Sequence, residues 1–159
     1  MTQLILDFLS QIGIPVQKTQ FTEPTFLPGI FINKGTLYYD PEKLLYPGDL
    51  LHEAGHIALM TPEERPVIVG NVKEYRLPSQ DDEMGVMAWT FAATKFLGIP
   101  PQVVFHPDGY HGQSESLIYG YESGMNLGLP LLVWMGMTSY ETFPKMDKWV
   151  RDTSPILEE

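Results

Sequence analysis

Residues His52-Glu53-Ala54-Gly55-His56 predict a helix that carries a metal site. Side chains four positions apart lie on one face of a helix, so His52 and His56 can direct their imidazoles at the same ion. Glu53 would then reach a water molecule on that ion and take its proton. The pattern is typical of zinc hydrolases, with the two histidines as ligands and Glu53 as general base.

The residues on either side of the motif support a helix. Pro47 and Asp49 suit a first turn, and Thr61-Pro62 predicts where the helix ends. The other positions hold residues that favour helices or fill a core, namely Leu50, Leu51, Ala54, Ile57, Ala58 and Leu59. Two surface histidines on an ordinary amphipathic helix are the plainer interpretation, but the apolar flanks indicate that most sides of the helix are buried.

The length and charge of the chain restrict the classes of function. Its 159 residues are the size of one domain, and we expect a single domain over residues 1–159. Twenty acidic residues against ten basic ones leave a net charge of −10, which repels nucleic acid phosphates. We therefore expect no nucleic acid partner, whereas basic substrates or partners would suit this charge.

The absence of cysteine excludes disulfides and Cys-ligated zinc sites. Any zinc must be held by His, Asp and Glu, the ligand set of catalytic sites. The N-terminus has no basic stretch and carries Asp7 among its apolar residues, which disfavours a signal peptide. The longest strongly apolar segment, residues 127–137, is too short to span a bilayer. These features predict a cytoplasmic protein that has no membrane partner.

Hydrophobic periodicity predicts an α+β fold. We expect a helix over residues 2–12 and a small β-hairpin whose strands cover residues 29–32 and 36–39. Residues 33–35 form its short glycine-containing turn. The motif helix follows almost at once along the chain, so the hairpin should pack on it.

A second long helix is expected from Asp81 or Asp82 to about Leu97. Residues 65–72 indicate a short strand or a connecting loop. Further along, we expect a short helix over residues 114–121 and a buried strand or helix over residues 131–135. Tyr140 to Arg151 is expected to form a terminal helix.

A catalytic zinc site usually has three protein ligands and leaves the fourth position to water. No histidine follows the motif before His106, so the third ligand must come from elsewhere. A carboxylate at the start of the second long helix is the natural candidate. Acids there often only complement the helix dipole, a role that Asp81 and Asp82 can fill. Glu83 is therefore favoured as the third ligand, followed by Asp82 and Asp81, and His111 is the last alternative.

This order of elements resembles the ImmA/IrrE family of HExxH zinc metallopeptidases. The family shows a hairpin, an HExxH helix such as the one around residues 52–56, and a second helix that begins with acids. Residues 81–88 fit the register of that second helix, although Gly85 and Met87 are atypical there. The resemblance covers roughly residues 28–97.

What the resemblance implies is a zincin-like fold of the gluzincin type. It makes His52, His56 and Glu83 the ligands of Zn2+ and Glu53 the general base. It also implies a protein or peptide substrate, such as a DNA-binding repressor, and such a basic regulatory protein would suit the acidic charge of this chain.

A peptidase also needs a hydrogen-bond donor for the oxyanion that develops during attack. His111 is the first candidate, followed by Tyr110 in the same loop and then by Tyr119 or Tyr121. Ligating histidines usually donate their other ring proton to a carboxylate or a carbonyl. Carboxylates that could accept it are Asp82, Asp49 and Glu122.

Three hypotheses for function follow from these residues. The first is a zinc-dependent metallopeptidase that hydrolyses a peptide bond with a zinc-activated water and Glu53 as base. The second is a non-catalytic zinc-binding module that acts by binding a protein partner, which the small chain, with little obvious room for a cleft, would suit. The third is an iron site of two histidines and one carboxylate. Glu53 favours hydrolysis, because metal binding alone needs no base beside the first histidine.

Overall fold

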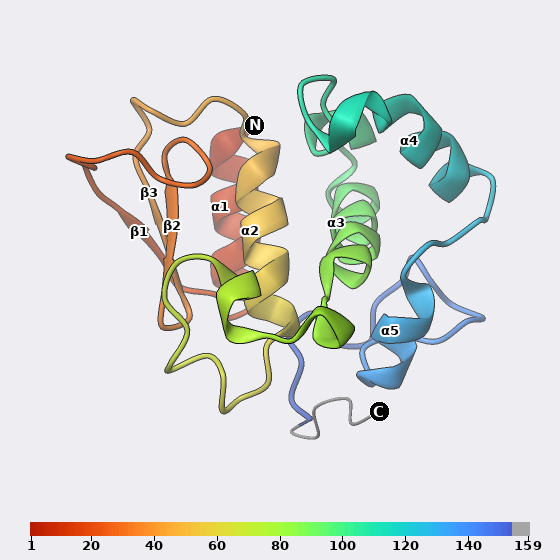
Figure 1. Ribbon diagram of the computed structural model, residues 1–159. Coiled ribbons are helices and arrows are strands. Elements are labelled where there is room, and N and C mark those ends of the chain that lie inside the picture. Colours follow the sequence, from red (N-terminus) through yellow and green to blue (C-terminus); the bar gives the residue numbers. More distant parts are fainter. Residues whose placement is uncertain (154–159) are drawn as a thin grey trace.

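Helix α2, Gly48–Leu59, carries the motif and lies between a small sheet and a second long helix in the computed structural model, which describes residues 1–153 (Figure 1). Strands β2 and β3 and helix α1, Thr2–Gln11, pack on one side of α2, and helix α3, Glu83–Leu97, packs on the other. All residues of α2 are buried except His52 and Glu53. The helix is therefore a core element with one accessible spot at the motif.

Three short strands form a sheet in the order β1-β3-β2. Their bounds are β1 Val16–Lys18, β2 Ile30–Asn33 and β3 Thr36–Tyr39. β2 and β3 form the predicted antiparallel hairpin, and its turn residues Lys34 and Gly35 have φ of 52° and 85°. Positive φ at both central positions gives a turn whose twist matches that of the strands. β1 pairs with β3 in parallel, which the sequence did not predict.

Two further helices follow α3, namely α4 Ser114–Glu122 and α5 Leu129–Trp134. α5 packs against α3, while α4 contacts the turns that precede it. These turns and those before α3 are short 3-10 helices: η1 Val72–Tyr75, η2 Pro78–Gln80, η3 Pro101–Val103 and η4 Tyr110–Gly112. Across residues 1–153, no helix combines the length and the apolar character that crossing a membrane requires.

The structure confirms the α+β class and most of the predicted elements. The helices expected at residues 2–12, at the motif and at residues 114–121 are present, and the second long helix begins at Glu83. The segment at residues 131–135, for which strand and helix were both open, is helical up to Trp134, the last residue of α5. Residues 65–71 form a connecting loop of turn and irregular structure, with one isolated bridge from Val69 to Asn33 of the hairpin, and Val72 begins η1.

The terminal helix expected for Tyr140 to Arg151 is wrong, because this segment consists of turns and irregular structure. Toward its end, backbone N–H groups bond outside the segment instead of to the preceding turn, and that of Arg151 donates to the Ala58 carbonyl in α2 at 2.8 Å. Those of Asp147 and Lys148 donate to the Met137 carbonyl, at 2.9 and 3.1 Å. The segment also places Trp149 edge-on against Phe8, with ring centroids 5.1 Å apart. Tertiary bonds and aromatic packing therefore outweigh the local helical pattern.

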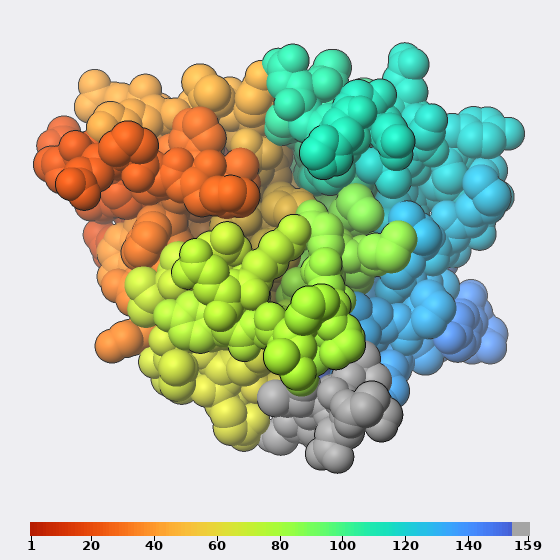
Figure 2. All heavy atoms as spheres, in the orientation of Figure 1, coloured from red at the N-terminus to blue at the C-terminus, as the bar shows by residue number. Residues whose placement is uncertain are grey.

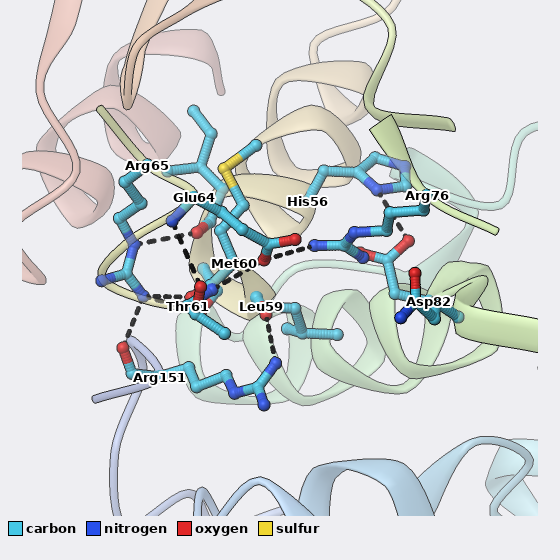
Figure 3. Close-up of polar contacts among 12 residues, drawn as sticks. His56, Leu59, Met60, Thr61, Glu64, Arg65, Arg76, Asp82 and Arg151 are labelled. Atoms are coloured by element: carbon cyan, nitrogen blue, oxygen red, sulfur yellow. Dashed lines mark hydrogen bonds and ion pairs between the residues drawn. The ribbon is translucent and has the colours of Figure 1, made fainter. Parts of the chain in front are cut away.

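Two arginines satisfy the last carbonyl groups of α2, which have no partner within the helix (Figure 3). Arg65 donates from Nε to the Ile57 carbonyl at 3.1 Å and from Nη2 to the Met60 carbonyl at 2.8 Å. Arg151 donates from Nη1 to the Leu59 carbonyl at 3.2 Å. Their positive charges also complement the negative end of the helix dipole, so the C-terminal end of the motif helix is held in place.

Gly55, inside the motif, lets α2 and α3 approach each other closely. A Cβ atom at this position would lie 2.9 Å from Val86 Cγ1 and 3.2 Å from Trp89 Cε3, both on α3. The stiff, branched valine side chain cannot move aside without disturbing the packing of the helix. The missing side chain at Gly55 therefore sets the distance between the helix that carries the two histidines and the helix that begins with Glu83.

We expect Gly55→Ala to lower the free energy of unfolding by about 1–3 kcal/mol, because it overpacks this contact. Alanine normally stabilises a helix relative to glycine by about 0.5–1 kcal/mol, so the sign of the effect is diagnostic. Gly120 in α4 is the matched control, since a Cβ there would meet its nearest atom at 3.7 Å. Urea unfolding of Gly55→Ala and Gly120→Ala should give opposite signs, and a stabilised Gly55→Ala would show that the helices are not in tight contact.

Candidate metal centre

His52, His56 and Glu83, predicted as metal ligands, lie side by side where α2 meets the start of α3. The Nε2 atom of His52 is 3.1 Å from Glu83 Oε2, and the Nε2 atom of His56 is 3.3 Å from Glu83 Oε1. Glu53 belongs to the same group, because ligand atoms of His52, Glu53 and His56 lie within 4.8 Å of one another. The structure thus brings together all four residues that the motif and the second helix indicated.

The three acids at the start of α3 have different surroundings. Asp81 accepts a hydrogen bond from the backbone N–H of Glu83 at 2.9 Å, so it stabilises the first turn of the helix. Asp82 is buried and points toward His56, with Oδ1 3.2 Å from Nδ1. Glu83 is left to face both imidazoles. This division of roles explains why Glu83, rather than Asp81 or Asp82, faces the two Nε2 atoms.

The geometry of these residues fits a tetrahedral cation. Ligand atoms about 2.0–2.2 Å from a tetrahedral zinc are about 3.3–3.5 Å apart, close to the observed N···O distances of 3.1 and 3.3 Å. Each histidine also has a partner for Nδ1, which is Tyr110 Oη at 3.2 Å for His52 and Asp82 for His56. An imidazole that carries its hydrogen on Nδ1 keeps the Nε2 lone pair for a cation.

Burial and neighbouring charges perturb the ionisable groups of the site. Burial raises the pKa of Glu53, although His56 and His52 oppose this shift. Burial would also raise the pKa of Glu83, but hydrogen bonds from the two histidines hold it well below its ordinary value. For His56, burial lowers the pKa, and Asp82 and Glu83 more than reverse this, giving about 10. A cation at Nε2 of His56 would therefore have to displace a proton.

A second polar group, which the sequence did not reveal, lies next to the motif. His106 Nε2 is 3.0 Å from Asp49 Oδ1, and the imidazole stacks on the Tyr46 ring with centroids 3.8 Å apart. The Tyr46 hydroxyl donates to Asp108 Oδ2. Asp49 lies three positions before His52, on the same face of the helix. This spacing is the sequence feature from which the group next to the motif could have been predicted. The group ties the loop around His106 to the first turn of α2.

His111, the first candidate for an oxyanion donor, is exposed in η4, and within residues 1–153 its side chain makes no hydrogen bond or ion pair. Its role stays a prediction. Tyr110 is the loop residue that reaches the site, through its contact with His52. Tyr110 and His111 both have left-handed backbone, with φ of 57° and 54°. Such residues persist only where surrounding contacts hold them.

The remaining candidates lie away from the ligand atoms. Tyr121 is buried and donates to the Leu127 carbonyl at 2.9 Å, while Tyr119 is exposed. Glu122, considered as a partner of a ligating histidine, instead pairs with Lys95 on the surface at 2.8 Å. Of the three carboxylates considered for that role, Asp82 alone contacts a motif histidine among the described residues.

The motif residues line a cleft of about 1140 Å³, although the short chain suggested little room for one. Residues 20–28, 70–73 and 106–113 supply much of its wall. Figure 2 looks onto this face, which is hollowed between the orange, yellow-green and teal segments. The volume is enough for a drug-sized ligand or several residues of a peptide.

No family model, no curated protein and no solved structure matches this chain. The resemblance to ImmA/IrrE peptidases therefore stays a prediction from the sequence, and the case for a metal centre depends on the geometry of the site.

In metal-free protein, we expect the free energy of unfolding to fall between pH 7 and pH 9. The folded state keeps the His56 proton up to about pH 10, whereas an unperturbed histidine releases it near 6.5. The stabilisation is complete below pH 6.5 and is lost as the pH rises toward 10, with a slope of at most about 1.4 kcal/mol per pH unit. Urea unfolding with chelator present measures the slope. His56→Gln should flatten it, and an unchanged slope in that variant would assign the effect to other groups.

Proposed function

We propose that this chain is a zinc-dependent metallopeptidase with a zincin-like fold. His52, His56 and Glu83 would hold the zinc, and Glu53 would act as general base. The observation that carries the proposal is the convergence of both Nε2 atoms on the Glu83 carboxylate, at 3.1 and 3.3 Å, beside Glu53 in an open cleft. Two histidines, one carboxylate and an accessible fourth side are the arrangement of catalytic zinc sites.

Zinc held there would supply a Lewis acid that polarises the substrate carbonyl and lowers the pKa of water. Glu53 takes the proton of the attacking water and passes it to the leaving amine. Its pKa is raised by burial, which makes it a stronger base than an exposed carboxylate. A purely structural metal site would not need this carboxylate.

Residues around the cleft have supporting roles in this proposal. Tyr110 orients His52 from behind through Nδ1, and burial raises its pKa, so the phenol keeps its proton. Asp49 and His106 hold the loop that carries Tyr110 against α2. His111, which also lines the cleft, is the group we propose as donor to the developing oxyanion.

The cleft favours a basic polypeptide as substrate. Its lining includes the acids Glu23 and Asp108 in addition to Glu53 and Glu83. Lys73 is the single Lys or Arg among the lining residues described. The chain as a whole carries a net charge of −10. Segments rich in Lys or Arg would therefore be attracted to this face. A regulatory protein with an exposed basic segment is the class of substrate that we propose, and a site for a partner without hydrolysis is the alternative.

We expect purified protein to contain about one zinc ion per chain by elemental analysis. His56→Ala and Glu83→Ala each remove a ligand and should lower the zinc content sharply, because both residues face the same point. Glu122→Ala is the matched control, since this acid is exposed and pairs with Lys95. No zinc in the wild-type protein after reconstitution would contradict the proposed function.

Glu53→Gln should retain zinc and lose hydrolysis, by about 10²–10⁴-fold for the loss of a general base. The probe is a library of fluorescence-quenched peptides, half of them rich in Lys and Arg and half rich in Asp and Glu. We expect wild-type protein to cleave the basic half preferentially. If Glu53→Gln keeps the biological activity of the wild type in cells, the non-catalytic binding module becomes the better account.

A further inference from the structure

A chain of buried charges leads from the end of α2 to His56 (Figure 3). The Nη1 atom of Arg76 is 2.6 Å from Asp82 Oδ2, and its Nη2 atom is 3.0 Å from Glu64 Oε1. Asp82 Oδ1 in turn lies 3.2 Å from Nδ1 of His56. Arg76 thus bridges two carboxylates, one of which faces a proposed zinc ligand.

The far end of this chain is fixed to the backbone. Glu64 Oε1 accepts from the Thr61 backbone N–H at 2.9 Å, and Thr61 Oγ1 accepts from the Glu64 backbone N–H at 3.2 Å. This reciprocal pair is a capping box directly after α2. Glu64 therefore holds the charged guanidinium of Arg76 in place beside Asp82.

The charge of Arg76 keeps Asp82 in its orientation. The Asp82 side chain is 3% exposed and that of Arg76 is 8% exposed, so water does little to stabilise either charge. Asp82 forms ion pairs with His56 and Arg76, but the geometry of these two contacts is not that of strong hydrogen bonds. Its position therefore depends on the guanidinium charge behind it more than on any one directional bond.

We infer that Arg76 is a positioning residue for the metal site. Held by Glu64, it keeps Asp82 directed at Nδ1 of His56, so that Nε2 of His56 faces Glu83. The inference rests on the proposed zinc site and adds to it a group that touches neither metal nor substrate. Loss of partners behind metal-ligating histidines typically weakens metal binding by about 10–100-fold.

The first test is zinc affinity, measured by competition with a chromophoric chelator at neutral pH. Arg76→Gln should bind zinc about 10–100-fold more weakly, whereas Arg76→Lys keeps the charge and should stay within about threefold of wild type. Arg65→Gln is the matched control, because this partly buried arginine contacts carbonyls at the end of α2 and not Asp82. It should lower stability and leave the zinc affinity of the folded protein within about twofold.

The second test asks whether Arg76 acts through Asp82. Asp82→Asn should weaken zinc binding, and adding Arg76→Gln to it should change the affinity no more than about twofold. This double variant removes both partners of the Asp82–Arg76 ion pair, so neither charge is left buried without the other. It can therefore be compared with Asp82→Asn even if Arg76→Gln alone does not fold. Cobalt substitution gives a spectroscopic readout, because the visible bands of cobalt should shift in Arg76→Gln and remain as in wild type in Arg65→Gln.

Wild-type zinc affinity and cobalt bands in Arg76→Gln, or additive losses in the double variant, would overturn the positioning role. Absence of zinc from the wild-type protein would instead overturn the proposed function and the positioning role together. A wild-type protein that binds zinc but cleaves no peptide would contradict only the peptidase, since the positioning role is measured by affinity.

Discussion

The close contact of α2 and α3 at Gly55 is the constraint on which the site depends. A helix directs its side chains along fixed directions, so a third ligand for an ion between His52 and His56 must come from an element that lies opposite them. Gly55 allows α3 to come close enough for Glu83 to fill that place. The same contact buries the facing sides of both helices, and in α2 only His52 and Glu53 are partly accessible. The contact at Gly55 therefore determines both the packing of the two helices and the position of Glu83 relative to the two histidines.

Burial of this site requires that its charges be paired. Asp82 lies between His56 and Arg76, and Arg65 and Arg151 cover the carbonyl end of α2. Unpaired, such charges would cost several kcal/mol each, so each is met by an opposite charge or a hydrogen-bonding group from another part of the chain. These contacts join α2, the loop after it, the start of α3 and the C-terminal segment. The ion pairs behind His56 and the hydrogen bonds that cover the end of α2 therefore both contribute to the stability of the fold.

Local signals in the sequence were strong enough for much of the fold. The glycine-containing turn predicted the β2–β3 hairpin, and periodic apolar residues predicted α1, α2 and α3. The segment from Tyr140 to Arg151 was expected to be a helix but forms none, because the N–H groups near its end bond outside the segment and Trp149 packs on Phe8 of α1. The parallel pairing of β1 with β3 likewise depends on residues far apart in the chain, which no local pattern reports.

For the site, the spacing of His52, Glu53 and His56 by itself determined that two imidazoles and a carboxylate would share one helical face, because helix geometry is local. Glu83 could be ranked first among three neighbouring acids, and the contact of Asp81 with the helix end is local, but only the tertiary structure turned Asp82 to His56 and Glu83 to both Nε2 atoms. The cleft, the contact of Tyr110 with His52, and the chain from Glu64 through Arg76 were likewise decided by tertiary structure. They join segments that are distant in sequence, and their contacts form only when the core brings those segments together.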